Sequence, residues 1–248
     1  MFKGIFTSAS GMKVNQERLN ITANNLANVD TNGFKRDESV QRSFREELVY
    51  KIEGNKATPL GRAGAGVMLE STYTQHQQAP LRKTGNQLDI AIEGSGFFVI
   101  DTPDGLRYTR DGSFTINNEG IIVTHQGYPV LGEGGPLETI SDRDITIDNN
   151  GQIHLEEMLG DSFQIVDFAE ANLLEKVGDN LYQANEEIEE IEANYQLRQG
   201  YLENSNVNIV QEMVNMIQVT RHYEANQKVI TTMDNILDQA VNSIARLG

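Results

Sequence analysis

Apolar side chains recur in alternating steps of three and four residues at both ends of the 248-residue chain. At the N-terminus, seven of the eight positions in this pattern are apolar; they are Phe2, Ile5, Ala9, Met12, Gln16, Leu19, Ala23 and Leu26. We call them the N-terminal seam. The spacing predicts a helix over roughly the first 28 residues, with a narrow apolar stripe of the coiled-coil kind. The pair Asn32-Gly33 is expected to turn the chain away from it.

The same spacing occupies the last 40 or so residues. Ten of twelve positions are apolar, and we call the set the C-terminal seam: Ile209, Glu212, Met216, Val219, Tyr223, Asn226, Ile230, Met233, Leu237, Ala240, Ile244 and Leu247. Asn208 is a plausible N-cap for this helix. At 1.5 Å per residue the helix would be roughly 60 Å long.

The simplest arrangement pairs the two seams as a coiled coil and leaves part of the longer C-terminal seam for other chains. A helical hairpin closed within one chain, with no role in assembly, satisfies the periodicity equally well. The spacing alone does not separate these two interpretations.

The middle of the chain has a different pattern. Short runs rich in β-branched and aromatic residues alternate with turn pairs such as Asp104-Gly105 and Asn150-Gly151. This spacing predicts an antiparallel all-β domain. The predicted strands cover residues 88–92, 97–101, 114–116, 121–124, 145–148, 153–155 and 163–168.

These patterns predict an α+β fold in which the terminal helices pair around an extended arm and a central β domain. The expected boundaries are 1–32 for the N-terminal helix, 33–82 for the arm, 83–185 for the β domain, 186–204 for a return segment and 205–248 for the C-terminal helix. Residues 54–66 are expected to form a linker or an extended arm. Residues 186–192 (EEIEEIE) fit either a short charged helix or a solvated return.

Charge and composition exclude several functions. The net charge is −16, and residues 63–198 carry 24 acidic and 7 basic side chains, which argues against nucleic-acid binding. There is no Cys for a disulfide, a thiolate metal site or a Cys nucleophile. No apolar run is long enough for a membrane span, and the N-terminus lacks a signal-peptide pattern. We therefore expect no membrane insertion, and any export without a cleaved signal.

Enzymatic motifs are weak. Gly94-Ser95-Gly96 lacks the third glycine and the following helix of a phosphate loop, so a tight turn is the better interpretation. The residues at calcium-loop positions are Thr146, Asp148, Asn150, Gly151 and Glu157, but Thr stands where Asp is needed and strands flank the segment. The four histidines lack metal-ligand spacing. A calcium-assisted hydrolase on the β domain is the alternative function class; we expect no enzyme, cofactor, metal or small-molecule substrate.

Residues 23–35 (ANNLANVDTNGFK) are similar to the N-terminal signature of the family of flagellar rod, hook and hook-associated proteins. Residues 86–99 (NQLDIAIEGSGFFV) and 108–130 (YTRDGSFTINNEGIIVTHQGYPV) resemble its β-domain motifs. Residues 200–225 (GYLENSNVNIVQEMVNMIQVTRHYEA) resemble its C-terminal signature. The order of the motifs matches, and a length near 250 fits the rod proteins FlgF and FlgG better than a hook protein.

The resemblance implies a structural subunit of the bacterial flagellar basal-body rod. Proteins of this kind are exported unfolded by the flagellar type III apparatus and polymerise helically with copies of themselves and other rod and hook proteins. The resulting tube crosses the periplasm and transmits torque. A hook-type axial protein of the same family is the alternative. The terminal helices would form the inner coiled-coil layers, and the β domain would face outward.

The expected interface residues lie in the two seams and the terminal motifs. Asn side chains both donate and accept hydrogen bonds, Gly33 can adopt a positive φ, and Phe34 supplies an apolar anchor. Polar Asn226 within the C-terminal seam is a candidate device for fixing register. The full set is Ile5, Met12, Leu19, Asn24, Asn25, Leu26, Asn28, Gly33, Phe34, Met216, Val219, Arg221, Tyr223, Glu224, Asn226, Ile230, Met233 and Leu237.

Overall fold

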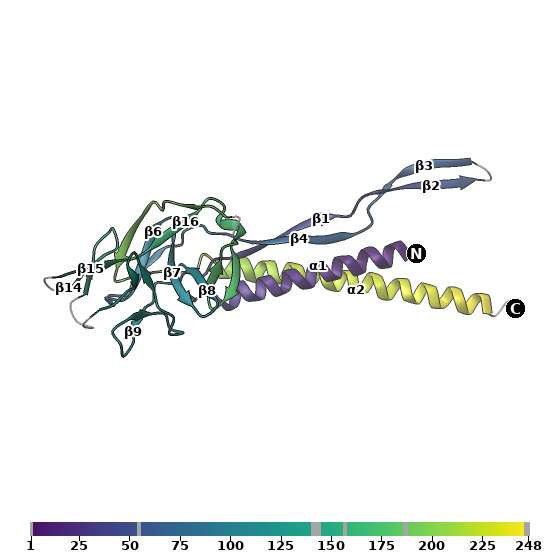
Figure 1. Ribbon diagram of the computed structural model, residues 1–248. Helices are drawn as coiled ribbons and strands as arrows, with labels where there is room; N and C mark the ends of the chain where they lie inside the picture. The colour runs from purple at the N-terminus through teal and green to yellow at the C-terminus, as the bar shows by residue number, and fades with distance from the viewer. Residues whose placement is uncertain (1, 54–55, 140–144, 156–157, 186–187, 246–248) are drawn as a thin grey trace. The chain divides into compact units, whose positions relative to one another are not determined.

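A computed structural model describes residues 2–53, 56–139, 145–155, 158–185 and 188–245. The chain divides into two compact units (Figure 1). The first, the helical unit, comprises Met1–Leu26, Asp37–Tyr73 and Ile209–Gly248. The second, the β unit, comprises Ala27–Arg36 and Thr74–Asn208. The predicted α+β class is confirmed, and each unit is described by itself below.

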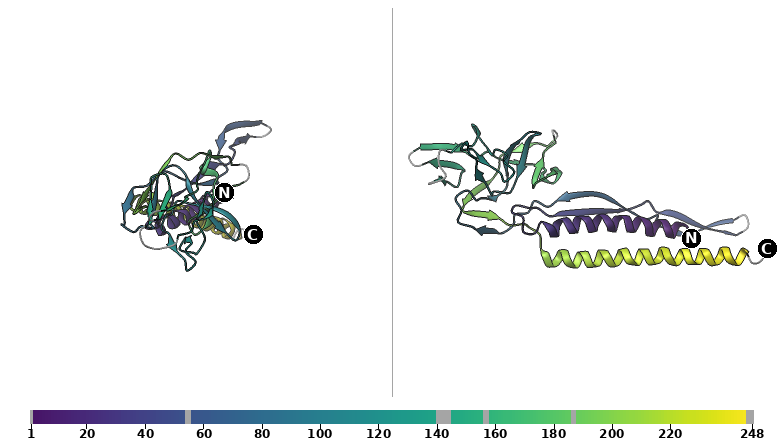
Figure 2. Two further views of the ribbon diagram at one scale, coloured as in Figure 1. Left: turned by 60° about the vertical axis from the view of Figure 1, so that its left-hand side comes forward. Right: turned by 90° about the horizontal axis from the view of Figure 1, so that it is seen from below.

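Two long helices run side by side in the helical unit (Figure 2). They are α1, Phe2–Ala27, and α2, Ile209–Ala245. A Cβ atom built on Gly4 would lie 3.1 Å from Met233, and one built on Gly11 would lie 2.9 Å from the amide nitrogen of Asn226. From Gly4 to Gly11 the contacts advance by seven residues along α1, while the partners on α2 move back by seven residues, from Met233 to Asn226. The two helices are therefore antiparallel.

The buried face of α1 differs from the N-terminal seam by one residue. Four buried polar side chains mark this face, namely Ser8, Asn15, Thr22 and Asn25. Seam members Ile5, Met12, Leu19 and Leu26 are only half-buried, and Ala9, Gln16 and Ala23 are exposed. This burial pattern does not confirm the expected coiled-coil pairing of the two seams. Gly4 and Gly11, which carry no side chain, form the close contact instead.

The buried face of α2 follows the predicted C-terminal seam. Glu212 and Val219 are 3% and 1% exposed, and the other members from Met216 to Ala240 are half-buried. Ile209, at the first residue of the helix, is exposed. Most of the remaining described side chains of α2 are exposed, including large apolar ones.

Four strands complete the helical unit within the region expected as an extended arm. Strand β1, Asp37–Ser43, pairs with β4, Val67–Thr74. Strands β2, Glu47–Glu53, and β3, Lys56–Ala63, form an antiparallel hairpin. The backbone N–H of Val67 donates to the Ser10 hydroxyl at 3.3 Å, which ties β4 to α1.

The β unit contains a six-stranded sheet in the order β17-β18-β8-β7-β16-β19. Its strands are β7, Phe97–Thr102; β8, Gly105–Thr109; β16, Ile165–Phe168; β17, Glu175–Gly178; β18, Leu181–Gln183; and β19, Glu190–Ile191. All five pairings are antiparallel. A short 3-10 helix, η1, spans Ala171–Leu173.

Smaller antiparallel sheets surround it, in the pairings β13-β14-β15, β20-β6, β21-β5, β9-β10 and β11-β12. The strands are β5, Leu81–Lys83; β6, Ile90–Gly94; β9, Thr115–Ile116; β10, Ile122–Val123; β11, Leu131–Gly132; β12, Gly135–Pro136; β13, Ile145–Ile147; β14, Gln152–Leu155; β15, Met158–Ser162; β20, Tyr195–Gln199; and β21, Tyr201–Glu203.

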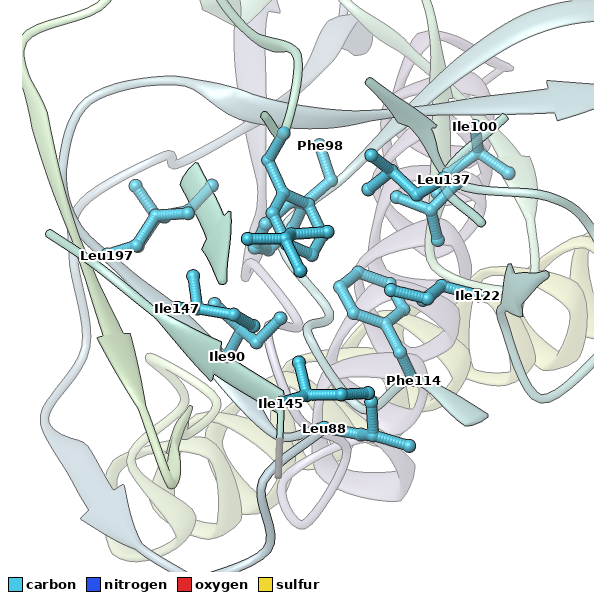
Figure 3. Packing of buried hydrophobic residues seen from close by; sticks show 14 of the residues in the cluster. Leu88, Ile90, Phe98, Ile100, Phe114, Ile122, Leu137, Ile145, Ile147 and Leu197 are labelled. Carbon is cyan, nitrogen blue, oxygen red and sulfur yellow. The ribbon is translucent and has the colours of Figure 1, made fainter. Parts of the chain in front are cut away.

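Strand β7 lies at the centre of the β unit with both faces covered. Phe98 and Ile100 join one hydrophobic cluster, shown in close-up in Figure 3. Phe97 and Val99 join the second cluster, together with Tyr108, Phe168, Leu174 and Tyr182. Burial on both sides explains why the sequence FFVI is apolar without alternation.

Each strand expected in the middle of the chain has a counterpart. The predicted segments 97–101 and 153–155 correspond to β7 and β14, with end residues shifted by one. Residues 190–191 form strand β19, so the described part of the EEIEEIE segment is extended rather than helical. Residues 186–187 and Glu157, a candidate calcium-loop position, lie outside the described residues.

Candidate functional site

Three charged side chains from distant parts of the sequence form a buried ion cluster in the β unit. The Lys35 ammonium lies 2.5 Å from Oε1 of Glu203, and both side chains are 0% exposed. The Arg110 guanidinium lies 3.7 Å from the other carboxylate oxygen of Glu203 and is 4% exposed. We refer to Lys35, Arg110 and Glu203 as the ion cluster.

Hydrogen bonds to backbone groups hold the ion cluster in place. Lys35 donates to the Gln77 carbonyl at 2.9 Å, and the Ala79 N–H donates to the Glu203 carboxylate at 2.7 Å. Both terminal nitrogens of Arg110 donate to the Gly94 carbonyl at 3.0 Å. Three chain segments thus contribute hydrogen bonds to the buried charges, whereas Arg110 Nε and Oε2 of Glu203 are buried without a hydrogen-bond partner.

Burial shapes the electrostatics of the cluster. Desolvation lowers the pKa of Lys35, and the adjacent Glu203 carboxylate works against that shift. Desolvation also lowers the pKa of Arg110, which Glu203 and Asp167 oppose. Two cations share the carboxylate of Glu203, so removing that carboxylate would leave both with a large uncompensated desolvation penalty.

Asn206 joins the same chain segments beside the ion cluster. Its side-chain oxygen accepts from the Arg36 N–H at 2.7 Å, and its amide donates to the Gln75 carbonyl at 2.7 Å. Its backbone N–H donates to the Phe34 carbonyl at 3.3 Å. One Asn therefore connects residues 34–36 to residue 75 and to the segment that precedes α2.

Gly33 and Phe34, both expected interface residues, lie in this region of the β unit. Gly33 has a φ of +66°, and its N–H donates to the Glu203 carbonyl at 2.7 Å. A Cβ atom there would come within 2.5 Å of the Arg110 backbone. The Phe34 ring is buried, and the Lys176 ammonium lies 4.1 Å from its centre, at cation–π distance. The side chain of Phe34 is thus enclosed within its own chain.

The Asn side chains of the N-terminal motif have separate positions. Asn25 is buried in the helical unit, where its amide donates to the Asp37 carbonyl at 2.9 Å and its oxygen accepts from the Asp37 N–H at 3.0 Å. The Asn25 side chain thus makes the same pair of hydrogen bonds with the Asp37 backbone that a neighbouring strand would make at the start of β1. Asn28 accepts from the Thr31 hydroxyl at 3.2 Å, whereas the Asn24 side chain is exposed.

The remaining expected interface residues lie along the two helices. On α1, Ile5, Met12, Leu19 and Leu26 are half-buried. On α2, Val219 is buried, Arg221 and Glu224 are exposed, and the half-buried ones are Met216, Tyr223, Asn226, Ile230, Met233 and Leu237. Asn226 and Met233 are the two that contact the α1 glycines.

Sequence reasoning missed Lys35, Arg110, Glu203 and Asn206. Each lies inside one of the motifs at residues 23–35, 108–130 and 200–225, so the motifs contained the signal. The ion cluster brings one residue from each of these three motifs together. Spacing along the chain could not reveal this, because the contacts join residues up to 168 positions apart.

The described residues show no arrangement typical of catalysis or metal binding. Within them, no group of three or more His, Asp or Glu side chains is placed to hold a metal ion. Asp148 instead accepts from the N–H groups of Asn150 and Gln152, each at 2.9 Å, as in an ordinary hairpin turn. The described helices include none with the length and apolar character needed to cross a membrane.

Three family models match the chain. "Flagella basal body rod protein" matches residues 5–35, "Flagellar hook protein FlgE/F/G D1 domain" matches residues 91–155, and "Flagellar basal body rod FlgEFG protein C-terminal" matches residues 198–243. The N-terminal match contains Lys35, the D1 match contains Arg110, and the C-terminal match contains Glu203. The ion cluster therefore unites all three matched regions.

Similar proteins align over nearly the whole chain. The flagellar basal-body rod protein FlgG of Buchnera aphidicola subsp. Acyrthosiphon pisum is 36% identical, with 96% of this chain and 98% of that protein covered. FlgG of Bacillus subtilis is 34% identical, with 98% and 99% covered. FlgF of Caulobacter vibrioides is 33% identical, with 100% and 99% covered. The chain belongs to the FlgF/FlgG family of flagellar basal-body rod proteins, which are structural proteins and not enzymes.

Proposed function

We propose that this chain is a structural subunit of the bacterial flagellar rod. The observation that carries the proposal is the alignment with rod proteins from one end of the chain to the other, with 98–99% of each relative covered. Coverage of this extent favours a rod subunit over a hook-type axial protein. The family assignment gives no support to a calcium-assisted hydrolase.

The subunit polymerises helically with copies of itself and other rod and hook proteins, and its helices form the assembly surface. Apolar side chains on the outer faces of α2 support this role. Val210 is 71% exposed, Ile217 54% and Val241 64%. Burying apolar area contributes about 25 cal/mol per Å², so neighbouring helices would gain from covering these side chains.

On α1, the one-residue offset leaves the N-terminal seam available as well. Ile5, Met12, Leu19 and Leu26 are only half-buried within the chain, and Phe6 is 71% exposed. We infer that the seam residues complete their coiled-coil packing against neighbouring subunits. Polar Asn226 then restricts which register the helices adopt.

The assembled rod carries torque across the cell envelope. Within each subunit, the β unit contains most of the acidic part of the chain and presents it to water. Residues 63–198 carry 24 of the 36 acidic side chains, which favours solvation of that region. We further propose that the flagellar type III export apparatus delivers the subunit to the rod.

The test is a clean deletion of the gene followed by electron microscopy of the basal bodies. We expect non-motile cells whose basal bodies end between the inner ring and the hook, and restoration of both by the wild-type gene. Variants lacking α1 or α2 should not restore them. Complete hooks and filaments on the deletion strain would refute the proposed function.

A further inference from the structure

His76 lies in the β unit, in the segment between β4 and β5 that supplies backbone partners to the ion cluster. Its ring packs edge-on against Phe97 and Tyr182, with ring centres 5.3 Å and 5.1 Å apart. Both ring nitrogens are inaccessible to solvent. His76 as a whole is half-buried, but the two nitrogens that would carry the protons do not reach water.

Three cations act on this imidazole electrostatically. They are Lys35 in the segment before β1, Arg110 directly after β8, and Lys176 on strand β17. Two carboxylates interact with these cations. Glu203 on β21 interacts with Lys35 and Arg110, and Asp167 on β16 interacts with Arg110. The Tyr182 hydroxyl also interacts with Arg110, and the Ala171 backbone in η1 interacts with the imidazole.

Burial is the main reason that the imidazole stays neutral. Together with the three cations it lowers the pKa of His76 to about 3, and the interaction with the Ala171 backbone opposes that shift only in part. An imidazolium here would add a positive charge to a region that already holds the buried cations Lys35 and Arg110.

We propose that His76 makes the attachment of residues 75–79 to the ion cluster sensitive to acid. Proton uptake by the imidazole converts a closed form, in which these residues are bound to the cluster, into an open form, in which they are released. These residues are held by a few specific bonds. The Gln77 carbonyl accepts from Lys35, the Ala79 N–H donates to Glu203, and the Gln75 carbonyl accepts from Asn206. Displacement of the ring from its aromatic site would pull on all of them, because His76 lies between Gln75 and Gln77.

The direction of the pH effect follows from proton linkage. A released His76 has the ordinary pKa of about 6.5, so the open form binds a proton more readily than the closed form. The stability of the closed form relative to the open form is therefore fully present above about pH 6.5 and is lost as the pH falls toward 3. Between pH 7.5 and pH 5.0 the opening equilibrium constant should rise about 30-fold. Ordinary Asp and Glu side chains change little in this window.

Hydrogen exchange of the full-length chain, corrected for the intrinsic pH dependence of exchange, measures this opening. The reporters are the amides of Ala79 and Arg36, which donate to Glu203 and Asn206. His76→Gln and His76→Phe should each abolish the 30-fold change, and the Phe variant retains an aromatic ring against Phe97 and Tyr182. His125→Gln, at an exposed histidine, should leave the change intact.

A second measurement needs no variant. In the folded wild-type chain, the imidazole NMR signals of His76 should not titrate between pH 7.5 and 5.0. An ordinary His76 midpoint near 6.5 in the folded chain would overturn the proposal. So would a 30-fold change that survives both His76 substitutions. Neither result would bear on the assignment to the rod.

Discussion

The Lys35 ammonium and the Glu203 carboxylate lie 2.5 Å apart with neither side chain exposed, although 168 residues separate them in the chain. Arg110 shares the same carboxylate. A buried pair of this kind holds its partners strongly once formed, because breaking it leaves a charge that neither water nor another group can satisfy.

Glu203→Gln should therefore destabilise the β unit strongly. The amide preserves an oxygen for the Ala79 N–H but leaves Lys35 and Arg110 without their shared carboxylate. We expect a loss of about 3–5 kcal/mol in the free energy of unfolding, measured by urea denaturation. Glu93→Gln is the matched control, since the Glu93–Arg198 pair is as short, at 2.6 Å, but about half exposed. Its loss should stay below about 1 kcal/mol; equal losses would contradict the role of burial.

Gly33→Ala should be among the most damaging single-methyl changes in the β unit. The new Cβ would meet the Arg110 backbone at 2.5 Å and would also sit at a φ of +66°. Strain and overpacking together should lower the free energy of unfolding by about 3 kcal/mol or more. Gly85→Ala separates the two causes, because Gly85 has a φ of +80° with no neighbouring atom within 4 Å. That variant should lose only about 1 kcal/mol.

Asn25→Asp should loosen the attachment of β1 to α1. The carboxylate still accepts from the Asp37 N–H, but it cannot donate to the Asp37 carbonyl and instead faces it. We expect a loss of about 1–3 kcal/mol in thermal unfolding of the helical unit, with faster exchange of the Asp37 amide. Asn20→Asp changes an exposed side chain on the same helix and should have little effect. Equal effects of the two variants would argue against a specific role for Asn25.

Gly11 and Asn226 should behave as an energetically coupled pair. Gly11→Ala places a Cβ atom 2.9 Å from the Asn226 amide, a distance that forces a shift of one side chain. Asn226→Ala removes the obstructing group, so the double variant should be more stable than the sum of the single changes predicts. A double-mutant cycle by thermal unfolding should give a coupling of about 0.5–3 kcal/mol. Additive effects would mean that the helices do not pack in this register.

Asn226→Leu tests the proposed role of Asn226 in register. A Leu in the C-terminal seam should stabilise the isolated helices, since a polar residue at such a position lowers coiled-coil stability. It should nevertheless impair rod assembly, because alternative registers become accessible. Swimming assays and electron microscopy of basal bodies measure the second effect. Normal motility in cells carrying the variant would rule out the register hypothesis.

Local patterns predicted the secondary structure well where one period dominates a segment. The stepwise apolar spacing predicted both helices, and the turn pairs predicted the β-rich middle with strands such as β7 and β14. These signals arise from residues close together in the chain. Resemblance to the family supplied the functional assignment that periodicity could not.

Two features depended on information that no local pattern contains. The apolar spacing of α1 did not reveal the close approach of Gly4 and Gly11 to α2, because a glycine adds nothing to a hydrophobic pattern. The ion cluster could not be predicted, because Lys35, Arg110 and Glu203 read individually as ordinary surface charges. Only the three-dimensional fold shows that they share one buried site.

The composition of the ion cluster has a consequence for the order in which the chain can fold. Lys35 and Arg110 both precede Glu203, so a chain that stops before residue 203 contains two cations destined for the interior and lacks the anion that neutralises them. Such a fragment cannot close the core around residues 33–36 and 75–79 without a heavy desolvation penalty. The core around these residues can therefore close only after Glu203 is present. A subunit truncated before residue 203 would leave this part of the β unit unfolded.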